Sequence, residues 1–350
     1  MVLPLMACRV KPVEVLARGC MAMNGDVAMQ GKMEMTGDLS TSIRQDNTAS
    51  PLKFVQVQGD SQSSNRVAVL EIDGLILNKN LTGYGSMGEN PVALLREKLS
   101  VIERDRSVQG IVLRINSPGG GVAATDMICH ELRRFRAQRP IPMVACLMDT
   151  GAGGGYYAAL ETDHILAQPT SLVGGVGVML NVYNLEDTLS QFNIASVAIK
   201  AGSKIDVPSP ERTMTAEEKE MLQQIADSFH TRFREDVTSQ RRRSIPSEQL
   251  DGRIMTGEQA LKVGLIDQIG YLDDAIAWIA QRLHVSSSQL QVVMLRRDND
   301  RAFTALDSTP NTPLQSSLIP LRLPGLDRSS LPTFLYLWQP DPSLVTAVGG

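Results

Sequence analysis

The chain of 350 residues contains only four cysteines and four histidines, and these scarcities narrow its chemistry. The cysteines show neither the CxxC spacing of metal sites nor the density of a disulfide scaffold; they are Cys8, Cys20, Cys129 and Cys146. No two histidines stand at HxxxH spacing, which argues against a zinc site and against a histidine-based catalytic triad. We therefore expect neither a metal nor an organic cofactor.

The chain also lacks an excess of positive charge and long apolar runs. The chain has 34 Lys and Arg against 38 Asp and Glu, a net charge of −4, and its one basic run, residues 241–243, is short. Such a balance creates no field that would gather nucleic acid. No apolar stretch approaches the roughly 18 residues of a transmembrane helix. The 43% hydrophobic content is enough for a folded core.

Residues 1–64 are rich in Met, Gly, Ser and Gln, and we expect a flexible segment there with at most a short strand or hairpin. "LPLMACRV" near the start is similar to the end of a bacterial lipoprotein signal. If translation starts upstream, Cys8 would be a lipidated first residue and the protein would belong to the cell envelope. The alternative is an ordinary flexible tail and a cytoplasmic protein.

Regular alternation of strands and helices begins at residue 65. "RVAVLEIDGLI", "VQGIVLRIN" and "IPMVACLMD" are continuous apolar strands, and the segments between them, from Pro91 and from Val122, have helical spacing. Strands of this kind form parallel or mixed sheets covered by helices. The sequence therefore predicts an α/β fold that binds ligands at the carboxyl ends of its strands.

Two glycine-rich segments follow these strands and are expected on the same rim. "NSPGGG", residues 116–121, predicts a sharp turn, and "TGAGGGYY", residues 150–157, a loop before a helix. Backbone N–H groups without side-chain cover suit an oxyanion hole or a phosphate cradle. No GK[ST] follows, so neither is a P-loop. A plain strand-to-helix turn remains the alternative.

The later chain contains a long amphipathic helix and a less regular end. Thr215 with Glu218 three residues on predicts a capped helix start. Apolar residues in 265–285 either cover the sheet or form subunit contacts; they are Leu265, Ile266, Ile269, Leu272 and Ile276. Residues 286–350 are rich in Ser and Pro and predict an irregular extension.

Several ordered motifs between residues 65 and 285 resemble the signal peptide peptidase A (SppA) family of serine peptidases. They are "RINSPGGG", "GGGYYAA", "TDHILAQP", "GGVGVM", "KAGSKIDVPSPERTMTAEEKEM" and "DGRIMTGEQALKVGLIDQIGYLDDAI". The resemblance implies the ClpP/crotonase-like fold, a repeated ββα superhelix, in a peptidase domain of residues 65–285. It also implies a homo-oligomer.

The resemblance also implies a Ser–Lys dyad, whose positions are substituted here. The family's nucleophilic serine falls on Gly153, its lysine base on Ile205, and the serine that supports the lysine on Gly175. Glycine has no oxygen to attack a carbonyl, and isoleucine cannot accept a proton. A neutral Ile205 is expected to sit in a buried pocket. An oxyanion hole at Gly119, Gly120 and Gly154 would survive.

We therefore expect an inactive member that binds extended or signal-peptide-like segments, or that acts as a scaffold or regulator of an active paralogue in the envelope. The alternative is an active peptidase with a displaced nucleophile. Its candidates are Ser117, Thr150 and Ser203, with Asp149 and Lys204 nearby. A third hypothesis, acyl-CoA chemistry in a bare oxyanion hole, matches the glycines but not the later motifs.

Overall fold

The computed structural model describes residues 50–81, 86–241, 243–309, 311 and 334–338. The chain divides into two units, Met1–Asn47 and Thr48–Gly350, and all described residues belong to the second. Cys8 and the segment around it lie outside the described residues. No helix within the described ranges is long and apolar enough to cross a bilayer.

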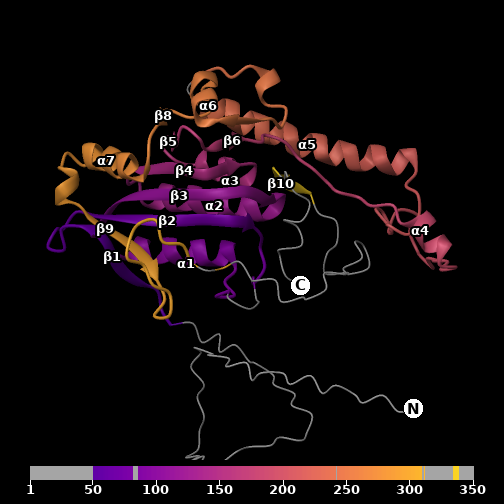
Figure 1. Ribbon diagram of the computed structural model, residues 1–350, viewed down its shortest axis with the longest axis horizontal. Coiled ribbons are helices and arrows are strands. Elements are labelled where there is room, and N and C mark those ends of the chain that lie inside the picture. The colour runs from indigo at the N-terminus through magenta and orange to yellow at the C-terminus, as the bar shows by residue number, and fades with distance from the viewer. Residues whose placement is uncertain (1–49, 82–85, 242, 310, 312–333, 339–350) are drawn as a thin grey trace, which may run out of the picture. The chain divides into compact units, whose positions relative to one another are not determined.

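The described residues form one ten-stranded, mostly parallel sheet (Figure 1). Its main path runs β1-β9-β2-β3-β4-β5-β8, with β1 antiparallel to β9 and the other neighbours parallel. Off this path, β6 pairs with β4 and β7, and β10 pairs with β3. The strands are β1 Lys53–Gly59, β2 Arg66–Ile76, β3 Val108–Gly121, β4 Met143–Ala152, β5 His164–Ala167, β6 Leu172–Gly174, β7 Ile254–Thr256, β8 Gln268–Ile269, β9 Gln291–Arg296 and β10 Leu335–Leu337.

Apolar side chains on both faces of the central strands explain why this sheet is buried. One cluster joins the sheet to α1 Pro91–Arg104, α2 Val122–Gln138 and α3 Gly154–Ala159. A second cluster joins the opposite face to α7 Leu272–Arg282. Strands covered on both faces are expected to be continuous in Val, Ile and Leu, as β2, β3 and β4 are. The predicted α/β class is confirmed.

The remaining helices are α4 Glu186–Gln191, α5 Ala216–Gln240, α6 Gly257–Val263 and the short 3₁₀ turns Ser247–Gln249 and Ser287–Gln289. α5 begins as predicted. The Thr215 side chain accepts from the backbone N–H of Glu218, and the Glu218 carboxylate accepts from the backbone N–H of Thr215. This reciprocal cap satisfies two donors at the helix start that would otherwise lack partners.

The sheet extends beyond the limits of 65 and 285 predicted from the sequence. β1 lies in the segment expected to be flexible, and β9 lies in the segment expected to be irregular. β9 is buried between β1 and β2, and its sequence QVVMLR is a short apolar run of the kind that fills a sheet interior. Leu272 and Ile276, for which two roles were open, cover the sheet within the chain.

Candidate active site

Residues 116–121 form the end of β3 and not the predicted sharp turn. Gly119 and Gly120 pair with Leu75 and Ile76 of β2 in extended conformation. The buried Ser117 hydroxyl donates to Gly74 O at 2.6 Å and accepts from Gly119 N at 3.1 Å. Neighbouring strands on both sides hold this glycine segment straight, which local sequence could not reveal.

The loop between β4 and α3 packs directly on these glycines. Gly153 has φ +50° and ψ −123°, a conformation that L side chains rarely adopt, and its N–H donates to Gly174 O at 3.0 Å. A Cβ on Gly119 would lie 2.7 Å from Gly154 N. Gly119, Gly120, Gly153 and Gly154 are therefore placed at one point of the sheet edge.

Gly175, the third substituted position, joins the same cluster. A Cβ on Gly175 would lie 3.1 Å from Gly153 N. Its own N–H donates to Arg253 O at 2.9 Å, which fixes the β6 end against β7. Two of the three positions that the family resemblance marks as polar thus meet in this chain, and both are glycine.

Ile205 does not join them. The expectation of a buried pocket for this side chain is wrong, because Ile205 is 72% exposed and lies on the segment between α4 and α5. The next residue, Asp206, belongs to an ion-pair cluster. Lys200 and Arg212 both pair with Asp206, at 2.7 and 2.9 Å. The exposed position explains why isoleucine there requires no compensating change inside the fold.

Of the candidate replacement nucleophiles, Ser117 has its hydroxyl engaged, whereas Thr150 and Ser203 are held through main-chain groups. Ser117 uses its hydroxyl to close the strand end, as described above. The backbone N–H of Thr150 donates to Asn116 Oδ1 at 3.1 Å, and Asn116 also donates to Asp149. In the described residues no Lys or His side chain hydrogen-bonds to the hydroxyl of Ser117, Thr150 or Ser203.

The flanking lysine is also engaged. Lys204 Nζ pairs with Glu217 Oε2 at 2.7 Å, and Ser203 contributes its carbonyl, not its hydroxyl, to Lys200. The Lys204 ammonium thus donates to a carboxylate and not to a hydroxyl. The sequence neighbours of Ile205 therefore form no nucleophile–base pair among the described residues.

One polar group at the site was missed by the sequence analysis. Thr125, in the first turn of α2, is fully buried, and its Oγ1 has no hydrogen-bond partner. A Cβ on Gly154 would lie 2.3 Å from that oxygen. The signal in the sequence was a hydroxyl residue four positions after Gly121, which one helical turn carries back onto the glycine loop.

Tyr156 and Tyr157 pack inward and are both buried. Tyr156 donates its hydroxyl to Leu265 O at 2.7 Å. Tyr157 stacks on Phe233 of α5 with ring centroids 4.5 Å apart and hydrogen-bonds Asp236. Burial, as the larger cause, and the hydrogen bond to Asp236 raise the pKa of Tyr157 well above its usual value. Neither phenol is available as a base at neutral pH.

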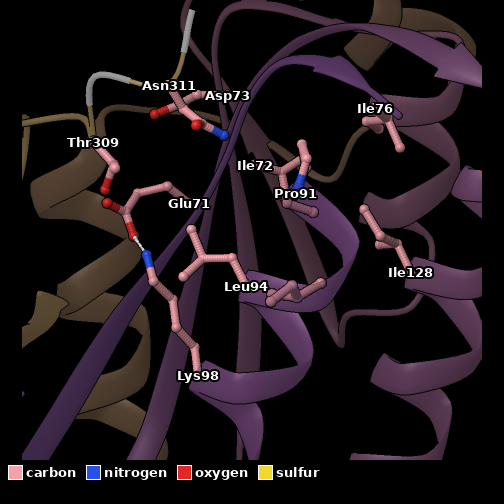
Figure 2. A pocket seen from close by; sticks show the side chains of 11 residues that line it. Glu71, Ile72, Asp73, Ile76, Pro91, Leu94, Lys98, Ile128, Thr309 and Asn311 are labelled. Atoms are coloured by element: carbon pink, nitrogen blue, oxygen red, sulfur yellow. Dashed lines mark hydrogen bonds and ion pairs between the residues drawn. The ribbon is translucent and has the colours of Figure 1, made fainter. Parts of the chain in front are cut away.

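A separate cavity of about 50 Å³ lies between β2 and α1 (Figure 2). Lys98 Nζ contacts Glu71 Oε2 at 2.7 Å there, and Arg296 pairs with the same carboxylate. Burial alone would raise the pKa of Glu71, but Lys98 and Arg296 more than offset it and hold this pKa below its usual value. The charges are paired with one another, so this cavity is a buried ion-pair network.

Metal-binding groups do not gather at either place. Within the described ranges no three His, Cys, Asp or Glu side chains are arranged to hold a metal ion. Cys129 and Cys146 are buried free thiols, and burial raises the pKa of Cys146 to about 12.

Comparison with known proteins agrees with the motifs. Residues 135–286 match Peptidase family S49. The chain is 30% identical over 219 residues to a putative signal peptide peptidase SppA of Enterococcus faecium, covering 62% of this chain and 63% of that protein. It is 34% identical over 194 residues to a putative protease of Methanocaldococcus jannaschii, covering 55% of this chain and 62% of that protein.

A putative protease of Synechocystis is 33% identical over 202 residues, which cover 57% of this chain and 71% of that protein. The chain thus spans less than two thirds of the length of the first two relatives. A solved membrane-bound stomatin-specific protease aligns at 17% identity, with a TM-score of 0.38, over 66% of this chain and 98% of that one. From the family match and the Synechocystis relative it follows that this chain, with its mostly parallel α/β sheet, belongs to peptidase family S49, the SppA family of serine peptidases with the ClpP/crotonase-like fold.

Proposed function

We propose that this S49 member does not cleave peptides and instead holds them in an extended form. The observation that carries the proposal is the glycine at position 153, where the family resemblance requires the nucleophile. Gly153 has no side-chain oxygen, Gly175 has no supporting hydroxyl, and Ile205 lies exposed on another segment. Acyl transfer needs a nucleophile and a base within hydrogen-bond reach, and this set of residues provides neither.

Peptide binding needs only backbone groups, which this site retains. The end of β3 has glycine at residues 119–121, so an incoming strand can approach its backbone without meeting side chains. Addition of a strand to such an edge gives affinity through main-chain hydrogen bonds, and side-chain pockets give selectivity. Extended apolar segments, including signal-peptide-like fragments, are the ligand class that we propose.

Self-association is the second part of the proposal. The segment between β6 and α5 exposes an unusual number of apolar side chains for its length; they are Val182, Tyr183, Phe192, Ile194, Val197, Ile199 and Ile205. Exposed apolar patches of this kind mark interaction surfaces in soluble proteins. We propose that a second copy, or an active paralogue, covers this segment, and that the assembly works in the cell envelope.

The test combines cleavage and covalent labelling on the full chain. An unfolded protein substrate and a fluorogenic peptide should both remain intact, and a fluorophosphonate probe should leave the chain unlabelled. A known serine peptidase, assayed alongside, is the positive control for both the substrates and the probe. Labelling of the unaltered chain, mapped by mass spectrometry to Ser117, Thr125, Thr150 or Ser203, would instead establish an active peptidase with a displaced nucleophile.

A further inference from the structure

Residues 334–338, named here the resident segment, already occupy the glycine edge of β3. Leu335, Tyr336 and Leu337 of β10 pair antiparallel with Gly121, Gly120 and Gly119. At the two ends of this pairing, Val122 N donates to Phe334 O at 3.1 Å and Trp338 N donates to Pro118 O at 2.9 Å. Figure 1 draws β10 in yellow, short and far along the chain from the strand that it joins.

The resident segment is hydrogen-bonded on its other edge as well. Met179 N donates to Leu335 O at 3.0 Å, and Leu335 N donates to Met179 O at 2.9 Å. A strand held on both sides fills a slot between β3 and the residues after β6. The slot is therefore a strand-binding groove, and the structure shows it filled.

Tyr336 anchors the resident segment in an aromatic pocket. Its ring lies 5.4 Å from that of Tyr157 and 5.0 Å from that of Phe233, and only 1% of the residue is exposed. The hydroxyl donates to Phe229 O at 3.0 Å. Helices α3 and α5 thus form a pocket that fits one aromatic side chain with a terminal donor.

Glycine at the substituted family positions is what lets the resident segment lie so close. A Cβ on Gly153 would stand 2.3 Å from Tyr336 O and 2.7 Å from its carbonyl carbon, and a Cβ on Gly119 only 1.8 Å from Tyr336 O. A Cβ on Gly175 would stand 3.3 Å from the Cβ of Trp338. Any side chain at position 153, a serine included, would displace the carbonyl of Tyr336.

We propose that the resident segment is this chain's own ligand for the peptide groove, and that the groove selects extended apolar peptides with an aromatic residue at the position of Tyr336. This inference rests on the proposed peptide binding and adds to it both a selectivity and a regulation. An incoming peptide must displace residues 334–338 before it can bind.

The direct test locks the resident segment in place. Gly121 and Leu335 are register partners, and a Cβ on Gly121 meets no atom closer than 3.8 Å, so a cysteine pair there suits a cross-strand disulfide. The full chain would carry Gly121→Cys and Leu335→Cys with Cys8→Ser and Cys20→Ser, since Cys129 and Cys146 are buried. The probe is a fluorescein-labelled peptide of sequence FLYLW, followed by anisotropy.

We expect the disulfide to form on oxidation and to reduce peptide affinity at least about tenfold. Reduction of the disulfide should restore the affinity. In the chain without the cysteine pair, Tyr336→Ala should raise affinity for the same peptide at least about tenfold, whereas the control Tyr271→Ala, at a tyrosine that is 56% exposed, should not change it. A peptide with alanine in place of its tyrosine should bind more weakly to every variant.

Hydrogen exchange on the unaltered chain distinguishes occupancy of the groove by the resident segment from the proposed peptide binding. Slow exchange at the amides of Val122, Leu335 and Trp338 is expected, and exchange at unfolded-chain rates would overturn occupancy by the resident segment. Measurable peptide binding of equal affinity in the locked and unlocked chains would overturn it too. If Tyr336→Ala loses this protection and yet no variant binds peptide, occupancy stands and the proposed peptide binding fails.

Discussion

Replacement of Tyr336 measures how strongly the fold retains its own strand. The side chain is buried, contacts two rings and donates one hydrogen bond at 3.0 Å. Truncation of a buried aromatic side chain to alanine typically costs about 3–5 kcal/mol. The lone hydrogen bond to a carbonyl contributes about 1 kcal/mol. Tyr336→Phe should therefore cost about 1 kcal/mol and Tyr336→Ala several times as much.

The two variants should also differ in whether the strand stays docked. Phe keeps the ring in the pocket, so the strand stays paired with residues 119–121. Ala removes the anchor, and a loss of about 3 kcal/mol lowers the ratio of docked to undocked strand by more than a hundredfold. Because an undocked strand can lose no more, the cost of Tyr336→Ala is limited to the free energy of docking.

The assay is urea unfolding combined with hydrogen exchange at the amides that join the strand to its neighbours, those of Val122, Met179, Leu335 and Trp338. Exchange should accelerate at these four amides in Tyr336→Ala and change little in the centre of β3. A cost below about 1 kcal/mol with unchanged exchange at all four would refute the reasoning, because it would mean that Tyr336 contributes little to docking.

Two further predictions follow from buried ionisable groups. Glu71→Gln removes the carboxylate shared by Lys98 and Arg296, and the uncompensated buried charge should cost about 3–5 kcal/mol in urea unfolding. The control Lys53→Met breaks a pair whose lysine is 60% exposed and should cost no more than about 1 kcal/mol. Equal costs would contradict the prediction. Burial raises the pKa of Tyr336 from 10.0 to about 12. The free energy of docking should therefore be constant below pH 10 and should fall between pH 10 and pH 12 by about 1.4 kcal/mol per pH unit. Trp338 fluorescence in a Trp278→Phe background reports this step, which Tyr336→Phe should abolish; an unchanged alkaline step in Tyr336→Phe would assign it to another group.

Much of the fold and part of the site could be predicted from local sequence. Continuous apolar strands alternating with helices specify a buried parallel sheet, and the capping box at Thr215 marks a helix start, because both depend on neighbouring residues. The residue types at Gly153 and Ile205 could also be read directly, and neither side chain can act as a nucleophile or a base whatever its surroundings.

Contacts between distant segments could not be predicted in this way. β9 was missed, and β1 was expected at most as a short strand without a position, because strands of 6 and 7 residues carry little periodic signal of their own. The two strands are stabilised by pairing with each other, and β9 also by pairing with β2. Residues 116–121 read as a turn because glycine permits one, and only the strands on both sides make them extended.

The position of Ile205 and the filling of the groove were likewise decided by tertiary structure. Ile205 follows a segment with few buried residues, so its motif position did not place it near Gly153. The sequence determined that glycine stands at positions 119, 153 and 175. Only the fold brought Tyr336 against them, because the pairing of a three-residue strand depends on a preformed edge and an aromatic pocket and not on any local pattern.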